Sequence, residues 1–210
     1  MNQAPDDAAA VKRDVDRVVA FSDGVFAIAI TLLVLSLEVP RDVSTEDLGE
    51  ALRDLWPELF TYALSFVVIG AYWMGHHRIF RSLQRVNAPL LAINLALLGF
   101  IALLPFPTEI LGRYGDTRLA TIIYAAAIGA VGSTSVLLWW YMNHAGLSTP
   151  IPAERVRIDM VRGAIAPAVF ALSIPIAFVD EGLAKVVWIL IWPINVFVNR
   201  RYPDQPENGP

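Results

Sequence analysis

The chain has 210 residues, of which 56% are hydrophobic and 17% are charged, and its mean hydropathy is +0.52. Soluble domains are about 45–50% apolar and about 25% charged, so the composition predicts an integral membrane protein and excludes a disordered chain. The net charge of -4 argues against a nucleic-acid-binding surface. The chain has no cysteine, which excludes thiol catalysis, thiolate metal sites and disulfides.

Six apolar runs are long enough for membrane helices, which need about 20 mostly apolar residues. The predicted spans are Val18–Val39, closed by Pro40, then Trp56–Gly75, Ala88–Phe106, Leu119–Met142, Gly163–Val179 and Leu183–Val198. The fold class predicted is therefore an all-α integral membrane protein with six transmembrane helices.

The distribution of basic residues predicts the orientation, because short cytoplasmic loops concentrate Lys and Arg. With the N-terminus inside, eleven of the sixteen basic residues fall on the cytoplasmic side, and five fall outside: Arg41, Arg53, Arg113, Arg118 and Lys185. Both termini are then cytoplasmic. We predict a cytoplasmic N-terminal segment at 1–17, a six-helix domain at 18–199 and a disordered cytoplasmic tail at 200–210.

An acid-rich stretch lies on the predicted outer side, between Glu38 and Glu58. It holds seven carboxylates: Glu38, Asp42, Glu46, Asp47, Glu50, Asp54 and Glu58. We favour an ordinary solvated loop. The alternative is a vestibule that raises the local concentration of cations.

The start of the first span places Arg17, Ser22 and Asp23 at the mouth of a membrane helix and just inside it. A charged side chain at the centre of a membrane helix costs about 2.5–3.5 kcal/mol on insertion scales, so Asp23 should have a partner and face protein or water. At 100° per residue Asp23 points about 140° away from Ile28. One helix therefore carries a polar side and an aliphatic side.

The aliphatic side holds Ile28, Thr31, Leu32 and Leu35, at the i, i+3, i+4, i+7 spacing of one helical stripe. Periodicity alone favours lipid contact or helix packing for this stripe. The alternative is a hydrophobic constriction, which gates ions by excluding water.

A second group of polar residues is predicted at the same depth on the second and third spans. Trp73 and His77 are four residues apart and share a helix face, whereas His76 and His77 point about 100° apart. We expect His77 and Asn94 to hydrogen-bond to Ser22 and Asp23, although such residues at a membrane boundary can also be simple interfacial anchors. No nucleophile-elbow, phosphate-loop or metal-ligand spacing occurs, so we predict neither an enzyme nor a cofactor or metal site.

These residues carry a resemblance to a known family. The string Arg17-x-x-x-Phe21-Ser22-Asp23-Gly24-x-x-Ala27-Ile28-x-x-Thr31-x-x-x-Leu35, followed by Pro40, Trp73 and His77-Arg78-x-Phe80, resembles the bacterial form of the transmembrane protein 175 family. The animal member is a lysosomal potassium channel. The resemblance implies a cation channel that assembles as a homotetramer in the bacterial plasma (inner) membrane, with potassium as permeant ion and a pore lined by four copies of the first span.

The resemblance also implies residue roles. Ile28, Leu32 and Leu35 match the constriction, Thr31 the hydroxyl implicated in selectivity, and the structural polar network comprises Arg17, Ser22, Asp23, Trp73, His77 and Asn94. A proton-conducting protein or secondary transporter using Asp23 and His77 remains the alternative. Pro167 and Pro175 are candidate helix breaks of the kind that transporters contain, although their spacing also suits a simple kink.

Overall fold

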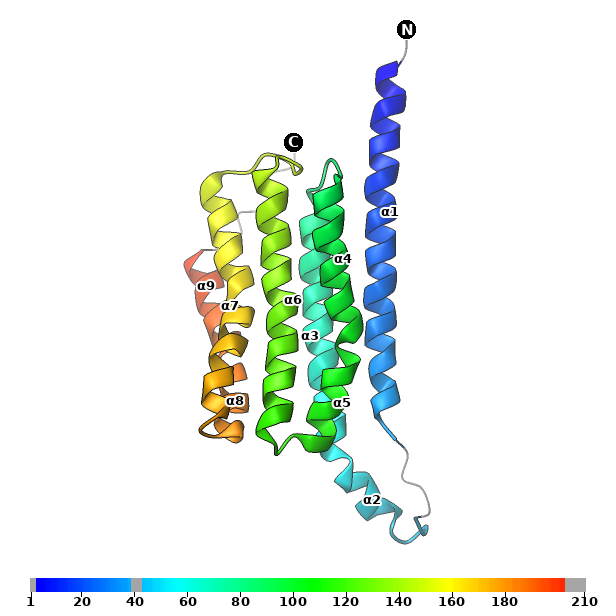
Figure 1. Ribbon diagram of the computed structural model, residues 1–210, viewed down its shortest axis with the longest axis vertical. Helices are drawn as coiled ribbons and strands as arrows, with labels where there is room; N and C mark the ends of the chain where they lie inside the picture. Colours follow the sequence, from blue (N-terminus) through cyan, green and yellow to red (C-terminus); the bar gives the residue numbers. More distant parts are fainter. Residues whose placement is uncertain (1–2, 39–42, 203–210) are drawn as a thin grey trace.

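The computed structural model describes residues 3–38 and 43–202, and regular structure within them is helical apart from one isolated β-bridge pair (Figure 1). The elements in chain order are α1 (Gln3–Leu32), the 3₁₀ helix η1 (Leu33–Ser36), α2 (Leu48–Asp54), α3 (Trp56–Arg81), α4 (Ala88–Leu103), α5 (Pro105–Tyr114), α6 (Arg118–His144), α7 (Ala153–Ala177), α8 (Glu181–Trp188) and α9 (Ile191–Arg201).

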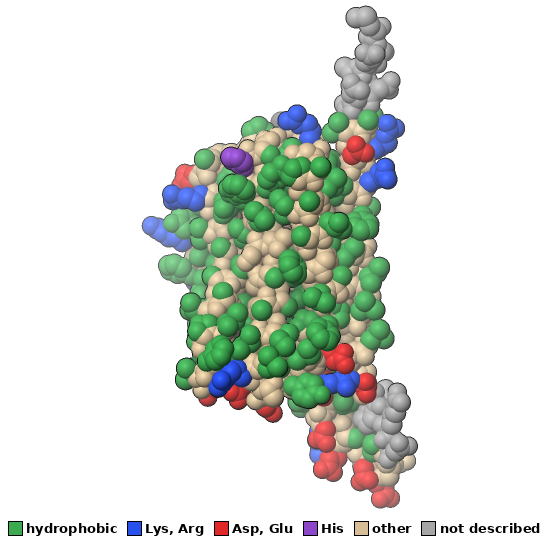
Figure 2. Space-filling model, in the orientation of Figure 1, with side chains coloured by type: hydrophobic (Ala, Val, Ile, Leu, Met, Phe, Trp, Pro, Cys, Tyr) green, Lys and Arg blue, Asp and Glu red, His purple; other side chains and the backbone are tan. Residues whose placement is uncertain are grey.

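Among the described residues, six helical segments are long and apolar enough to cross a membrane: Ala9–Ser36, Trp56–Arg81, Ala88–Tyr114, Arg118–His144, Ala153–Ala177 and Glu181–Val198. Hydrophobic side chains cover the middle of the bundle, and charged ones gather toward its two ends (Figure 2). A band of this kind is typical of a bundle that lies in a bilayer. The prediction of an all-helical protein with six membrane helices is confirmed.

Several helix ends differ from the predicted ones. α1 begins at Gln3 and runs through the segment that we assigned to the N-terminus, while Val39, Pro40 and the tail from residue 203 lie outside the described residues. The third span continues past Phe106 to Tyr114, because α5 follows α4 after one residue. Pro105 starts α5, where a proline needs no N–H partner.

The last two spans differ from each other in continuity. Pro167 and Pro175 both lie inside α7, so neither breaks this helix. The sixth span is divided into α8 and α9 at Ile189 and Leu190. Pro193 lies in the first turn of α9 and cannot donate an N–H back to Ile189, which is consistent with a break at this point.

The core lies where α6 meets its neighbours. Tyr124 on α6 is fully buried, and its ring lies 6.2 Å from Phe170 and 5.3 Å from Trp188, centroid to centroid. Trp188 also donates its indole N–H to Ser173 Oγ at 2.9 Å. These aromatic contacts fix α7 and α8 on one side of α6, while α4 packs on another.

Two connections are paired at the end of the bundle where α3 ends. Gln84 N donates to Leu147 O at 2.8 Å, and Thr149 N donates to Ser82 O at 2.8 Å. Leu83 and Ser148 form an antiparallel bridge between them. The turn after α3 is thereby joined to the turn after α6.

Candidate functional site

One side of α1 is buried against the rest of the bundle. Ser22, Phe26, Ala29 and Leu33 recur at the four- and three-residue spacing of one helix face and are all buried. This face packs on α3 and α4. The bundle therefore fixes the rotation of α1 about its own axis.

The opposite side of α1 carries the predicted stripe, which is exposed. Ile28 is 60%, Leu32 40% and Leu35 72% exposed, and Thr31 is exposed with them. Thr31 Oγ1 donates to Ile28 O at 2.9 Å, so the hydroxyl proton is bound within the helix. In a single chain, both lipid contact and pore lining require this exposure.

A chain of hydrogen bonds anchors the buried side of α1, and each residue in the chain donates to the next. His76 Nε2 bonds Asn94 Oδ1 at 2.9 Å, Asn94 Nδ2 donates to Ser22 Oγ at 3.0 Å, and Ser22 Oγ donates to Val18 O at 2.8 Å. Because a side-chain amide oxygen only accepts, Nε2 is the protonated ring nitrogen. All three side chains are buried, and they join α3, α4 and α1.

His76 therefore occupies the place that we predicted for His77. The His76 ring stacks on Phe80 at 4.1 Å and lies 5.4 Å from Phe26. His77 is exposed, and its ring lies 5.8 Å from Trp73 with no hydrogen bond among the described residues. The predicted hydrogen bond from His77 is wrong because the two histidines point in different directions, and only His76 faces the core.

Asp23 and Trp73 form the second link between α1 and α3. Trp73 Nε1 donates to Asp23 Oδ1 at 2.9 Å, so the carboxylate has the partner that its position demands. Arg17 is exposed and makes no hydrogen bond or ion pair within the described residues. The structure thus brings together Ser22 with Asn94 and Asp23 with Trp73, and it leaves Arg17 and His77 outside these bonds.

The sequence held a signal for His76. Ser65, Ile69, His76 and Phe80 are buried on α3 and recur at spacings of four, seven and four residues. His76 thus belongs to the core-facing stripe of its helix. Extending the periodicity from Ile69 to Phe80 distinguishes the two histidines.

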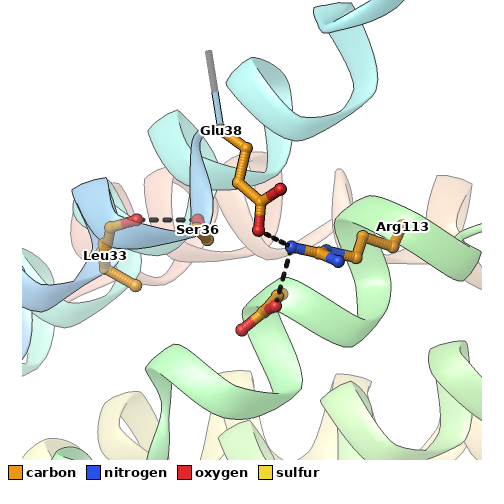
Figure 3. A network of polar contacts seen from close by, with 5 residues as sticks. Leu33, Ser36, Glu38 and Arg113 are labelled. Carbon is orange, nitrogen blue, oxygen red and sulfur yellow. Dashed lines mark hydrogen bonds and ion pairs between the residues drawn. The ribbon is translucent and has the colours of Figure 1, made fainter. Parts of the chain in front are cut away.

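An ion-pair cluster holds α1's other end. Arg113 on α5 lies 2.6 Å from Glu38 and 3.1 Å from Glu109 (Figure 3). Glu38 follows η1, in which Ser36 Oγ donates to Leu33 O at 2.7 Å. α1 is therefore tied to the bundle at both ends of its exposed stripe.

Comparisons with known proteins match this arrangement. Residues 17–105 match the model of a family described as the endosomal/lysosomal potassium channel TMEM175. A protein named a potassium channel from Streptomyces collinus is 37% identical, over 80% of this chain and 84% of its own length. Another so named, from Chamaesiphon minutus, is 32% identical over 83% of this chain and 90% of its own.

The chain belongs to the TMEM175 family. A crystal structure described as a lysosomal potassium-selective channel TMEM175 homologue from Chamaesiphon minutus superposes with a TM-score of 0.77 at 29% identity, covering 91% of this chain and 100% of that one. The TMEM175 fold is thus shown. The relatives are channels by name and not enzymes, which agrees with our prediction. The region matched by the family model contains α3, α4 and the part of α1 from Arg17 onward, and with them Ser22, Asp23, Trp73, His76 and Asn94.

Proposed function

We propose that this chain is the subunit of a potassium-permeable, modestly selective cation channel with a hydrophobic constriction on α1. The observation that carries the proposal is the two-sided α1, anchored by buried polar bonds on one face and exposing Ile28, Thr31, Leu32 and Leu35 on the other. Family membership, and the potassium-channel names of the bacterial relatives, support potassium as the permeant ion.

Four copies would place the stripe around one axis, because a repeated head-to-tail interface closes into a ring. Rings of Ile28 and Leu35 side chains would then exclude water, and small rotations of α1 would switch conduction. A potassium ion loses less hydration energy than sodium on entering such a gap. We therefore expect modest selectivity, since no carbonyl cage replaces the lost water.

The assembly and its membrane are part of the proposal. We infer a homotetramer in the bacterial plasma membrane, with both termini cytoplasmic and 18–199 as the channel domain. Termini on one side are supported by the direction of the last helix, since α9 runs from the end of the bundle where α8 lies toward the end where α1 begins (Figure 1). The acids around α2 would then lie outside, at the entrance that a cation meets first.

The test is ion flux from liposomes that contain the purified protein. We expect potassium, rubidium and caesium to pass down their gradients, and Ile28→Asn to raise leak and flatten the discrimination between ions. Leu172→Asn is the matched control, because Leu172 is 64% exposed on α7 and lies away from the stripe. A folded, tetrameric protein without flux at any voltage would refute the channel, and equal effects of the two variants would remove Ile28 from the constriction.

A reversal-potential measurement separates the channel from its alternative. In mixed potassium and sodium, a potential that follows the potassium gradient and ignores a pH step supports the channel. A potential that follows pH would instead favour proton conduction, with Asp23 and His77 as the titratable residues.

A further inference from the structure

The uncovered side of α1 extends beyond the aliphatic stripe, toward the start of the helix. Exposed residues recur there at spacings of four, three, four, three and four: Arg17, Phe21, Gly24, Ile28, Thr31 and Leu35. Phe21 is 59% exposed, as much as Ile28. Alternating spacings of three and four mark the seam of helices that pack on one another. The seam of α1, meaning these six residues, is therefore longer than the stripe.

The composition of this seam fits contact with copies of α1 around a water-filled path better than contact with lipid. Glycine gives a lipid-facing surface little apolar area, and Arg17 places a charge at the start of the seam. α1 also stands at the edge of the bundle in Figure 1, with one flank open. A second copy of this chain is the occupant that a closed ring would place on that flank.

The seam alternates between bulky and small positions. A helix rises 1.5 Å per residue, so Gly24 lies about 4.5 Å from the level of Phe21 and about 6 Å from that of Ile28. A methyl group built on Gly24 would have no neighbour within 4 Å. Because Gly24 has no side chain, its level would be wider than the levels of Phe21 and Ile28 wherever copies of α1 face one another.

We propose that Phe21 and Gly24 form a second pore layer, a chamber that holds a partly dehydrated monovalent cation between an aromatic ring of side chains and the Ile28 constriction. The inference rests on the proposed channel function. Aromatic faces attract cations, and the attraction is strongest for ions that have shed water, which favours larger monovalent ions. Asp23, held by Trp73, points to another side of α1, so the aromatic ring is the group of this layer that would contact the ion.

The first test is thiol accessibility, which the chain allows directly because it has no cysteine of its own. Phe21→Cys introduces a single thiol, and a charged methanethiosulfonate reagent should block most of the flux through this variant while leaving the unmodified protein unaffected. Phe66→Cys is the matched control, since Phe66 is 45% exposed on α3 and lies off the seam. The reagent should not change its flux.

Ile28→Cys distinguishes a failure of the Phe21 layer from a failure of the proposed pore on α1. If the reagent blocks Ile28→Cys but not Phe21→Cys, the pore on α1 stands and the Phe21 layer is overturned. If it blocks neither variant although both conduct, the pore on α1 itself is overturned. Block of both, with Phe66→Cys unaffected, supports the chamber.

The second test measures ion preference. Phe21→Leu keeps an apolar side chain but removes the aromatic face, and the caesium-to-sodium permeability ratio should fall about 2- to 5-fold, the magnitude expected of one exposed cation–π contact. Phe21→Tyr should keep the ratio. Gly24→Ala should lower flux by narrowing the chamber, and Gly129→Ala on α6, which also has open space at its Cβ, should not. An unchanged ratio in Phe21→Leu would overturn the aromatic role.

Discussion

His76→Phe should destabilise the protein, whereas His77→Phe should not. The first change keeps an aromatic ring that can stack on Phe80, with a somewhat larger volume, but it removes the donor that lies 2.9 Å from Asn94 Oδ1. A buried acceptor left without a partner costs about 1–3 kcal/mol. Hydrogen bonds inside membrane proteins average about 0.6 kcal/mol. We therefore expect a loss of about 1–2 kcal/mol from His76→Phe.

His77 provides a matched control on the neighbouring position. It is exposed and has no buried polar partner among the described residues. Substitutions at such positions change stability by less than about 0.5 kcal/mol. The pair therefore isolates the hydrogen bond from the general effect of placing a phenylalanine at this end of α3.

The assay is heating in detergent, followed by size-exclusion chromatography of the assembled fraction. For a chain of this size 1 kcal/mol shifts the midpoint by about 2–4 °C, so His76→Phe should lower it by about 2–8 °C. Combining His76→Phe with Asn94→Leu should cost less than the sum of the two, because both remove the same bond. An equal or larger shift from His77→Phe would refute the assignment of His76 to the network.

Two further predictions concern packing and charge. Gly132→Ala should lower the same midpoint, because the added methyl would lie 2.7 Å from the Tyr72 hydroxyl and 2.8 Å from Pro167 Cδ. Such overpacking costs about 1–3 kcal/mol. An unshifted midpoint would show that α6 and α7 move apart without cost. Arg113→Gln should cause a small loss of thermal stability at low salt that disappears at high salt, because the ion pairs of Arg113 are solvent-exposed. A loss of stability that persists at high salt would contradict this.

Hydropathy predicted which segments cross the membrane, but it could not predict where the helices begin. α1 starts at Gln3 and α7 at Ala153, well before the apolar runs that identified them. Charged and polar residues such as Lys12 and Arg157 are good helix formers in water. An apolar run marks the part of a helix that lies inside the bilayer, and the helix itself can continue into the water on either side.

The effect of the prolines was also not predictable from the sequence. Pro167 and Pro175 were candidate breaks, yet α7 passes through both. Pro167 lies against Gly132 of α6, where the absence of a side chain leaves room for the proline ring. Whether a proline interrupts a helix depends on such neighbours, which a single run of sequence does not reveal.

The candidate site was predictable where one helix determines it. Periodicity on one span placed Asp23 and Ile28 on different sides of α1, and the structure confirms that separation. The partner of Asn94 was not predictable from membrane depth alone, because His76 and His77 lie at nearly the same depth and differ only in the direction of their side chains. The packing of α3 against α1 and α4 decides between them.

The joined turns after α3 and α6 impose an order on biosynthesis. Ser82 and Gln84 find their backbone partners only at Leu147 and Thr149, more than sixty residues further along the chain. The α3–α4 hairpin therefore enters the membrane with these polar groups exposed to the aqueous phase. It becomes locked only when the end of α6 has left the ribosome, so α3, on which α1 packs, gains this support late in synthesis.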